Sequence, residues 1–136
     1  MGSEMCIRDR SYHASLTNTL NTSGASSIVF DLLFSETNAR LQEGDQLFAQ
    51  QIGEANTVFL PVAIQAIRTS GPLIEVTPTP LLYQASNKLG HAHIHCNDDG
   101  ICRSVYLEEG LGNKLWPHIT WAVSYTHLTL PTINSV

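Results

Sequence analysis

The stretch from Gly90 to Arg103 constrains the fold of this 136-residue chain more than any other. Successive side chains of a strand point to opposite faces, so the alternation here places three histidines on one face: His91, His93 and His95. Asp99-Gly100 follows, and Asp-Gly readily supplies the positive φ angles of a tight turn. Residues 101–107 are expected to return as a second strand, so the sequence predicts a β-hairpin.

Two apolar segments before this hairpin predict a parallel pair of strands. Residues 27–34 are mostly apolar, which is typical of a central strand covered on both faces, and Asp31 interrupts them. Asp45 is expected to cap a helix over residues 46–55, whose apolar face would hold Leu47, Phe48, Ile52 and Ala55. Residues 57–62 form the next expected strand, ended or edged by Pro61. Strand, helix and strand in this order form a βαβ unit.

Shorter elements are expected around these. Residues 11–20 are interpreted as the end of a helix, 73–76 as at most a short strand, and 81–88 as a short helix. Residues 114–122 follow helical spacing, with Leu115, Ile119 and Ala122 on one side and Pro117 in the first turn. The predicted fold class is α/β: a mixed sheet with a βαβ unit, followed by a helix, a β-hairpin and a C-terminal helix.

Composition and motifs exclude several functions. A net charge of −5 argues against a nucleic-acid surface, which needs clustered Lys and Arg. No apolar run reaches the roughly 18–20 residues that span a membrane, and no signal peptide is recognisable. The sequence contains no Gly-rich phosphate loop, no Ser-His-Asp order and no acid/base pair with catalytic spacing, so no catalytic residue is predicted.

The two ends of the chain read as additions to a natural segment. Residues 2–10 and 123–132 resemble the translated adapters of a transposon-based sequencing library. Codons for residues 5–9 can also be the reverse complement of codons for residues 124–127, which unrelated protein ends have little reason to share. We therefore expect adapter-derived tails at 1–10 and 123–136, and a natural metagenomic fragment at 11–122. The alternative is two ordinary flexible tails.

The histidine face is one candidate site. Two imidazoles two residues apart on a strand can share a metal ion, and a carboxylate could complete a site for Zn²⁺, the one cofactor that the sequence suggests. The alternative is a polar strand face without metal, because a single strand supplies only part of a coordination shell.

Three further features carry candidate chemistry. Cys96 and Cys102 are separated by five residues across the predicted hairpin, which allows either a disulfide or two buried free thiols. Asp31 lies towards the carboxyl end of a predicted parallel strand, where α/β folds place ligand sites. Arg103 is expected to pair with a carboxylate such as Asp31 or Asp99.

Several motifs together resemble the CHASE domain of the second type. Residues 28–36 are similar to its first strand, and Gly44-Asp45 with Val58-Phe59-Leu60-Pro61 is similar to its next helix and strand. Leu89-Gly90-His91, Asp98-Asp99-Gly100 and Arg103 resemble its Leu-Gly-His…Asp-x-Asp-Gly…Arg signature, and Leu115-Trp116-Pro117 its ending. The resemblance covers about residues 14–122 and marks a set of ligand-binding or structural residues: Asp31, His91, Asp99, Gly100 and Arg103. The other two histidines of the face and the two cysteines depart from the pattern.

This resemblance implies a periplasmic sensory domain of a bacterial inner-membrane receptor, without catalysis of its own. Such domains follow one membrane helix and usually precede several more, and their parent proteins carry histidine kinase, adenylate cyclase or cyclic-di-GMP enzyme outputs. The expected partners are an unidentified small-molecule or environmental signal and the membrane, through flanking helices outside this chain. A homodimer is a further expectation. One alternative is a periplasmic metal- or small-molecule-binding α/β protein that uses the histidine face, and another is a small hydrolytic enzyme built around Asp31.

Overall fold

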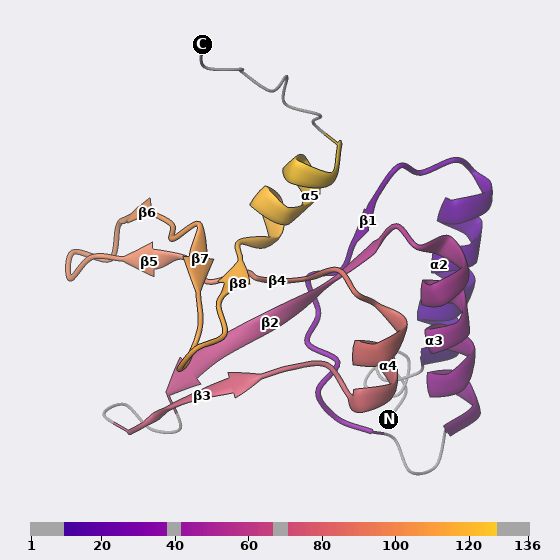
Figure 1. Cartoon of the computed structure of the whole chain (residues 1–136), viewed down its shortest axis with the longest axis horizontal. Helices are drawn as coiled ribbons and strands as arrows, with labels where there is room; N and C mark the ends of the chain where they lie inside the picture. Colours follow the sequence, from indigo (N-terminus) through magenta and orange to yellow (C-terminus); the bar gives the residue numbers. More distant parts are fainter. Residues whose placement is uncertain (1–9, 38–41, 67–70, 128–136) are drawn as a thin grey trace.

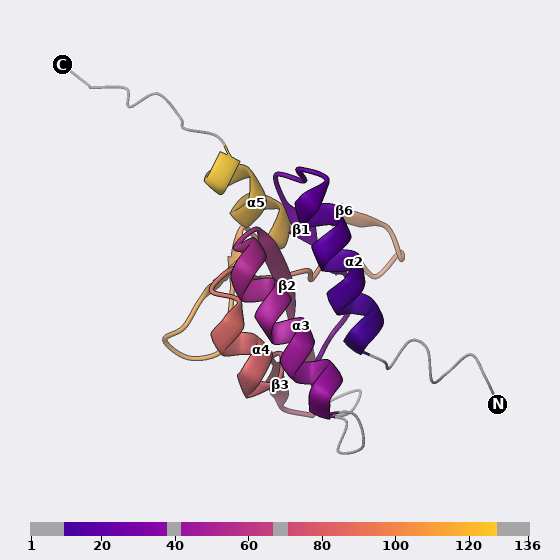
Figure 2. The same ribbon diagram turned by 90° about the vertical axis from the view of Figure 1, so that its right-hand side faces the viewer.

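The computed structural model describes residues 10–37, 42–66 and 71–127. A long strand, β2 (Val58–Ala66), runs through the middle of the molecule (Figure 1). Helices α2 (Arg10–Thr22) and α3 (Gln42–Ala55) lie side by side against it, and α4 (Pro80–Ala85) lies beside α3 (Figure 2). The other elements are β1 (Ile28–Val29), β3 (Leu73–Val76), β4 (Leu89–His91), β5 (His95–Cys96), β6 (Cys102–Ser104), β7 (Glu108–Glu109), β8 (Trp116–Pro117) and α5 (Ile119–His127).

The sheet around β2 is mixed, which confirms the predicted α/β class. β2 pairs in parallel with β1 and with β4, and its second half pairs antiparallel with β3. The parallel β1–α3–β2 connection confirms the predicted βαβ unit. Within the described ranges, no helix is long and apolar enough to cross a membrane.

The central strand is β2, and the prediction that residues 27–34 form it is wrong. Strand β1 pairs with β2 only at Ile28 and Val29, and Val29 is 47% exposed. β2 continues through Pro61 to Ala66, although Pro61 was expected to end or edge it.

Pro61 explains both differences. The Phe59 carbonyl accepts a hydrogen bond from the N–H of Phe30, the residue directly after β1, whereas the Leu60 N–H donates to the Lys88 carbonyl on the opposite side. Backbone groups alternate sides along a strand, so the next N–H facing β1 would belong to residue 61, where proline has none. The β1 ladder therefore stops there, while pairing with β4 and β3 carries β2 onwards.

An aromatic cluster fills the space between the helices and the sheet. The rings of Phe30, Phe34 and Phe48 are 5.2–5.6 Å apart, edge to face, and are almost fully buried. Each contributes roughly 2–3 kcal/mol by burial. The buried face of α3 contains Phe48 and Ile52 as expected, but Leu47 is exposed.

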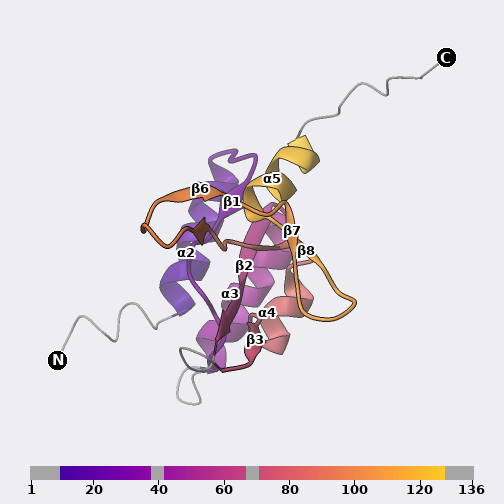
Figure 3. The same ribbon diagram turned by 90° about the vertical axis from the view of Figure 1, so that its left-hand side faces the viewer.

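The second half of the chain differs most from the prediction. The expected strand over 91–96 is divided: β4 enters the main sheet, whereas β5 forms a short exposed hairpin with β6. A second hairpin, β7–β8, lies between this arm and the sheet in Figure 1, and Figure 3 shows that the two hairpins extend in different directions. Pro117 belongs to β8, so the last helix begins at Ile119 instead of 114, and Leu115 is exposed.

Candidate functional site

Two histidines distant in sequence meet at the centre of the molecule. His91 at the end of β4 is fully buried, and His118, just before α5, is 8% exposed. Their ring centroids are 5.0 Å apart. Gly90 makes this approach possible, because a Cβ atom there would lie 2.8 Å from the Ile119 Cα and 2.9 Å from the Pro117 carbonyl oxygen. The Gly90-His91 pair of the signature thus allows the start of α5 to pack closely against β4 of the sheet.

Glu109 on β7 joins a third histidine to this pair. Its Oε2 lies 2.8 Å from Nδ1 of His93 and 3.9 Å from Nδ1 of His91. The His93 backbone N–H donates to Nδ1 of His91 at 3.3 Å. We call His91, His93, Glu109 and His118 the histidine–glutamate cluster.

Electrostatics keeps His91 neutral. Burial lowers the pKa of His91 below its usual value of 6.5, and the neighbouring His118 lowers that pKa further, whereas Glu109 opposes the shift. Since Nδ1 of His91 accepts a hydrogen bond, the proton of the neutral ring lies on Nε2. That nitrogen is buried and finds no partner in the described part of the chain, and the same is true of Nε2 of His118.

Of the three histidines on the predicted face, His93 and His95 have ring centroids 6.1 Å apart, whereas His91 is separated from them in the main sheet. His91 lies in the sheet, His93 is half-buried beside Glu109, and His95 is exposed with its ring 5.5 Å from that of Tyr106. Since β4 ends at His91, the strict alternation on which that face rested is broken. Among the residues that the structure describes, no group of three or more His, Cys, Asp or Glu could hold a metal ion.

A cleft opens where β1 ends. It has a volume of about 440 Å³ and lies between the segment that follows β1 and the second half of β2. Asp31 lines it, next to Leu32 and Leu33, and Ala92 and His93 line it as well. Asp31 forms no hydrogen bond or ion pair with any described residue. The cleft therefore brings Asp31 close to the histidine–glutamate cluster, although these residues are far apart in sequence.

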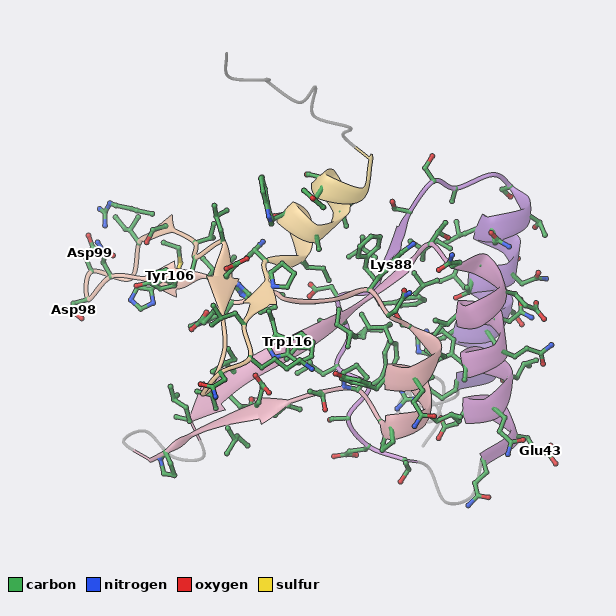
Figure 4. The ribbon with its side chains drawn as sticks, viewed as in Figure 1. Glu43, Lys88, Asp98, Asp99, Tyr106 and Trp116 are labelled. Carbon is green, nitrogen blue, oxygen red and sulfur yellow. A yellow bond between two sulfur atoms is a disulfide. The ribbon has the colours of Figure 1, made fainter. Side chains whose placement is uncertain are left out.

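The remaining signature residues form the exposed hairpin arm, which lies at the opposite end of the molecule from α2 and α3 (Figure 4). Oδ1 of Asp99 accepts the Ile101 N–H at 2.9 Å, and Arg103 donates to both carboxylate oxygens of Asp99 at 3.0 and 2.8 Å. The hydrogen bond from the Ile101 N–H lowers the pKa of Asp99 most, and the bonds from Arg103 lower this pKa further. Gly100 has a φ of 76°, the conformation expected for this turn. Of the two carboxylates offered to Arg103, the structure therefore selects Asp99 and not Asp31.

The two cysteines close the same arm. Cys96 and Cys102 are direct partners in the β5–β6 register and form a disulfide, with their Cα atoms 3.8 Å apart. Both residues are exposed. The bridge therefore ties the two strands of the arm together and has no contact with the cleft.

Sequence reasoning missed Glu109 and His118. Glu109 lies after the hairpin strand expected over residues 101–107, and His118 lies inside the helix expected over residues 114–122. One signal could have found His118: it directly follows the Trp-Pro motif, and Gly90, beside His91, indicates a close backbone neighbour.

Comparison with known proteins gives one match. The family described as CHASE2 domain matches residues 6–135. No curated protein and no solved structure matches the chain significantly. The matched range includes residues on both sides of the predicted natural segment, 11–122.

Proposed function

Because the chain belongs to the CHASE2 family of extracellular, non-catalytic sensory domains, we propose that it is the signal-sensing part of a bacterial inner-membrane receptor. The domain would lie in the periplasm, between membrane helices outside this chain. The receptor would carry a histidine kinase, an adenylate cyclase or a cyclic-di-GMP enzyme in the cytoplasm. Sensing then means that a signal stabilises one of two arrangements of the domain, and that the difference reaches the membrane.

One observation supports this proposal most strongly: a continuous path of contacts from the cleft to the last described helix. His93 lines the cleft and binds Glu109 on β7. β7 pairs with β8, and His118 follows β8 directly. Nδ1 of His118 contacts Thr120 in the first turn of α5, at 2.7 Å from its Oγ1. A ligand that moves His93 therefore acts on groups that position the start of α5.

The β7–β8 hairpin is firmly held, so it can transmit such a change. Nε1 of Trp116 donates to the Glu75 carboxylate on β3 at 2.6 Å, and Nζ of Lys114 lies 3.9 Å from the Trp116 ring centroid. These contacts fix the end of the hairpin nearest the sheet, where Figure 4 shows Trp116. A displacement of Glu109 would then shift β8 and α5 together instead of being absorbed by a loose loop.

The test uses the parent receptor. Glu109→Gln keeps the shape of the side chain but weakens its bond to His93, so we expect the enzymatic output, measured at equal receptor level, to change about fivefold or more. Asp98→Asn, on the exposed hairpin turn, is the matched control and should leave the output unchanged. Equal outputs from Glu109→Gln and the unmodified receptor would contradict the proposed path.

The location is tested separately. Gln84 lies exposed on α4, so a Gln84→Cys receptor should react with a membrane-impermeant maleimide in intact cells. Labelling that requires cell lysis would show that the domain faces the cytoplasm.

A further inference from the structure

The cleft at the end of β1 contains an acid, Asp31, that has no partner among the described residues and is surrounded by apolar side chains. Its lining is Asp31, Leu32, Leu33, Pro61, Val62, Ala63, Ile64, Gln65, Ala92 and His93. Its volume of about 440 Å³ falls within the range of ordinary small-molecule sites. Within the described residues, neither Lys nor Arg lines it.

Two polar groups of the cleft, the Asp31 carboxylate and Nε2 of His93, can accept hydrogen bonds from a ligand. The Asp31 carboxylate has no partner among the described residues. Nδ1 of His93 lies 2.8 Å from the Glu109 carboxylate, and this contact fixes Nδ1 as the donor in the neutral ring. The lone pair of His93 then lies on Nε2. Gln65, at the exposed end of β2, can adapt its amide to either role.

From this arrangement we infer that the cleft binds a small organic ammonium ion, a protonated primary amine with a short apolar body. The ammonium group donates to the Asp31 carboxylate and to Nε2 of His93. The apolar body covers Leu32 and Leu33, which are 42% and 44% exposed in the free chain. This ligand class rests on the proposed sensory function, because it names what that function would detect.

Other ligand classes fit the cleft less well. An anion would meet the Asp31 carboxylate without a cation to balance it. A purely apolar molecule would cover Asp31 without giving it a partner, which is costly. A bare metal ion would lack ligands, because no group of three suitable side chains occurs among the described residues. The net charge of −5 also attracts cations to the molecule as a whole.

The experiment compares three probes that share a phenyl body and differ in charge: phenethylamine, phenethyl alcohol and hydrocinnamate. Binding to the full chain is measured by calorimetry near neutral pH. We expect the amine to bind and to lose about tenfold or more in affinity in Asp31→Asn, because a charge-assisted bond is lost. The matched control Asp98→Asn should bind as the unmodified chain does. Circular dichroism checks that each variant is folded.

A second variant tests whether the amine binds in this cleft without changing any charge. Ala92 lines the cleft and is exposed, so Ala92→Leu should fill the cleft and abolish binding of the amine without disturbing the core. Equal binding of all three probes, or full affinity in Asp31→Asn, would overturn the ligand class.

The proposed function can fail separately. Maleimide labelling in intact cells without binding of the amine would leave the sensory role standing and remove the ligand class. If the receptor binds the amine but its domain is labelled only after lysis, the ligand class stands and the periplasmic sensory role falls.

Discussion

At the scale of single residues, Gly90 decides whether the histidine–glutamate cluster can form. We expect Gly90→Ala to destabilise the domain by about 1–3 kcal/mol, because its Cβ would meet backbone atoms of Pro117 and Ile119 that cannot move freely. Urea unfolding of the two chains measures the difference.

Gly53 provides the matched control, since a Cβ there meets nothing within 4 Å. Gly53 lies in α3, where alanine is the better helix former, so Gly53→Ala should stabilise by about 0.5–1 kcal/mol. If both substitutions stabilised the chain, the close packing of α5 on β4 would be wrong.

His91 makes stability depend on pH. Its pKa is lowered in the folded chain, so above the unfolded value of 6.5 both states are neutral and the group adds no pH dependence. As the pH falls below 6.5, the unfolded state takes up the proton first, and stability decreases until the folded pKa is passed. We therefore expect the free energy of unfolding, measured by urea titration, to be lower at about pH 5.5 than at about pH 7.5.

Variants assign this slope to His91. His91→Gln should flatten it, whereas the exposed His95→Gln should not. Glu109→Gln should steepen it, because Glu109 raises the pKa of His91 and its loss lowers that pKa further. A slope that is the same in all four chains would show that other groups are responsible.

At the scale of elements, Pro61 sets the length of β1 and with it the opening of the cleft. We expect Pro61→Val to restore a donor facing β1, so the new amide should bond to the Phe30 carbonyl and the ladder should lengthen. Hydrogen exchange measured by NMR should then show a protected amide at residue 61 and slower exchange at Leu32. Unchanged exchange at Leu32 would mean that another cause ends the ladder.

Local patterns predict the elements that depend on local physics. Apolar spacing indicates α3, and the run over 57–62 indicates β2, because both bury a continuous apolar surface. The extent of β1 is not local: it depends on a proline about thirty residues away in the neighbouring strand. The division of β4 from β5 likewise depends on β4 joining β2, which competes with the simpler hairpin.

The candidate site is predictable in part for the same reason. His91 and Asp31 stand in recognisable motifs, but His118 and Glu109 come to them from a segment that offers only short two-residue strands. Such strands carry no periodicity, so their pairing is set by tertiary contacts such as that between Trp116 and Glu75.

At the scale of the whole molecule, the contacts of Arg10 bear on where the folded unit begins. The sequence predicts an adapter-derived tail up to residue 10, and the first described residue, Arg10, already lies in α2 with its side chain buried. Nε of Arg10 lies 3.1 Å from the Asp45 carboxylate. An amino group of the same guanidinium donates to the Glu36 carbonyl at 2.8 Å, and the guanidinium carbon lies 4.6 Å from the centroid of the Phe34 ring. Asp45 is thus an ion-pair partner inside α3 and not the expected cap.

These contacts predict that Arg10 belongs to the folded domain. Among the described residues, Arg10 is the only ion-pair partner of the buried Asp45 carboxylate. Arg10→Met leaves that carboxylate unpaired, so the free energy of unfolding should fall by about 3 kcal/mol. Arg103→Ala is the matched control: its pair with Asp99 is half exposed on the arm, so the urea unfolding midpoint should stay the same. Adding Asp45→Asn to Arg10→Met should recover part of the loss, since the unpaired charge is then gone. An Arg10→Met chain as stable as the unmodified one would place the start of the domain after residue 10, as the adapter interpretation requires.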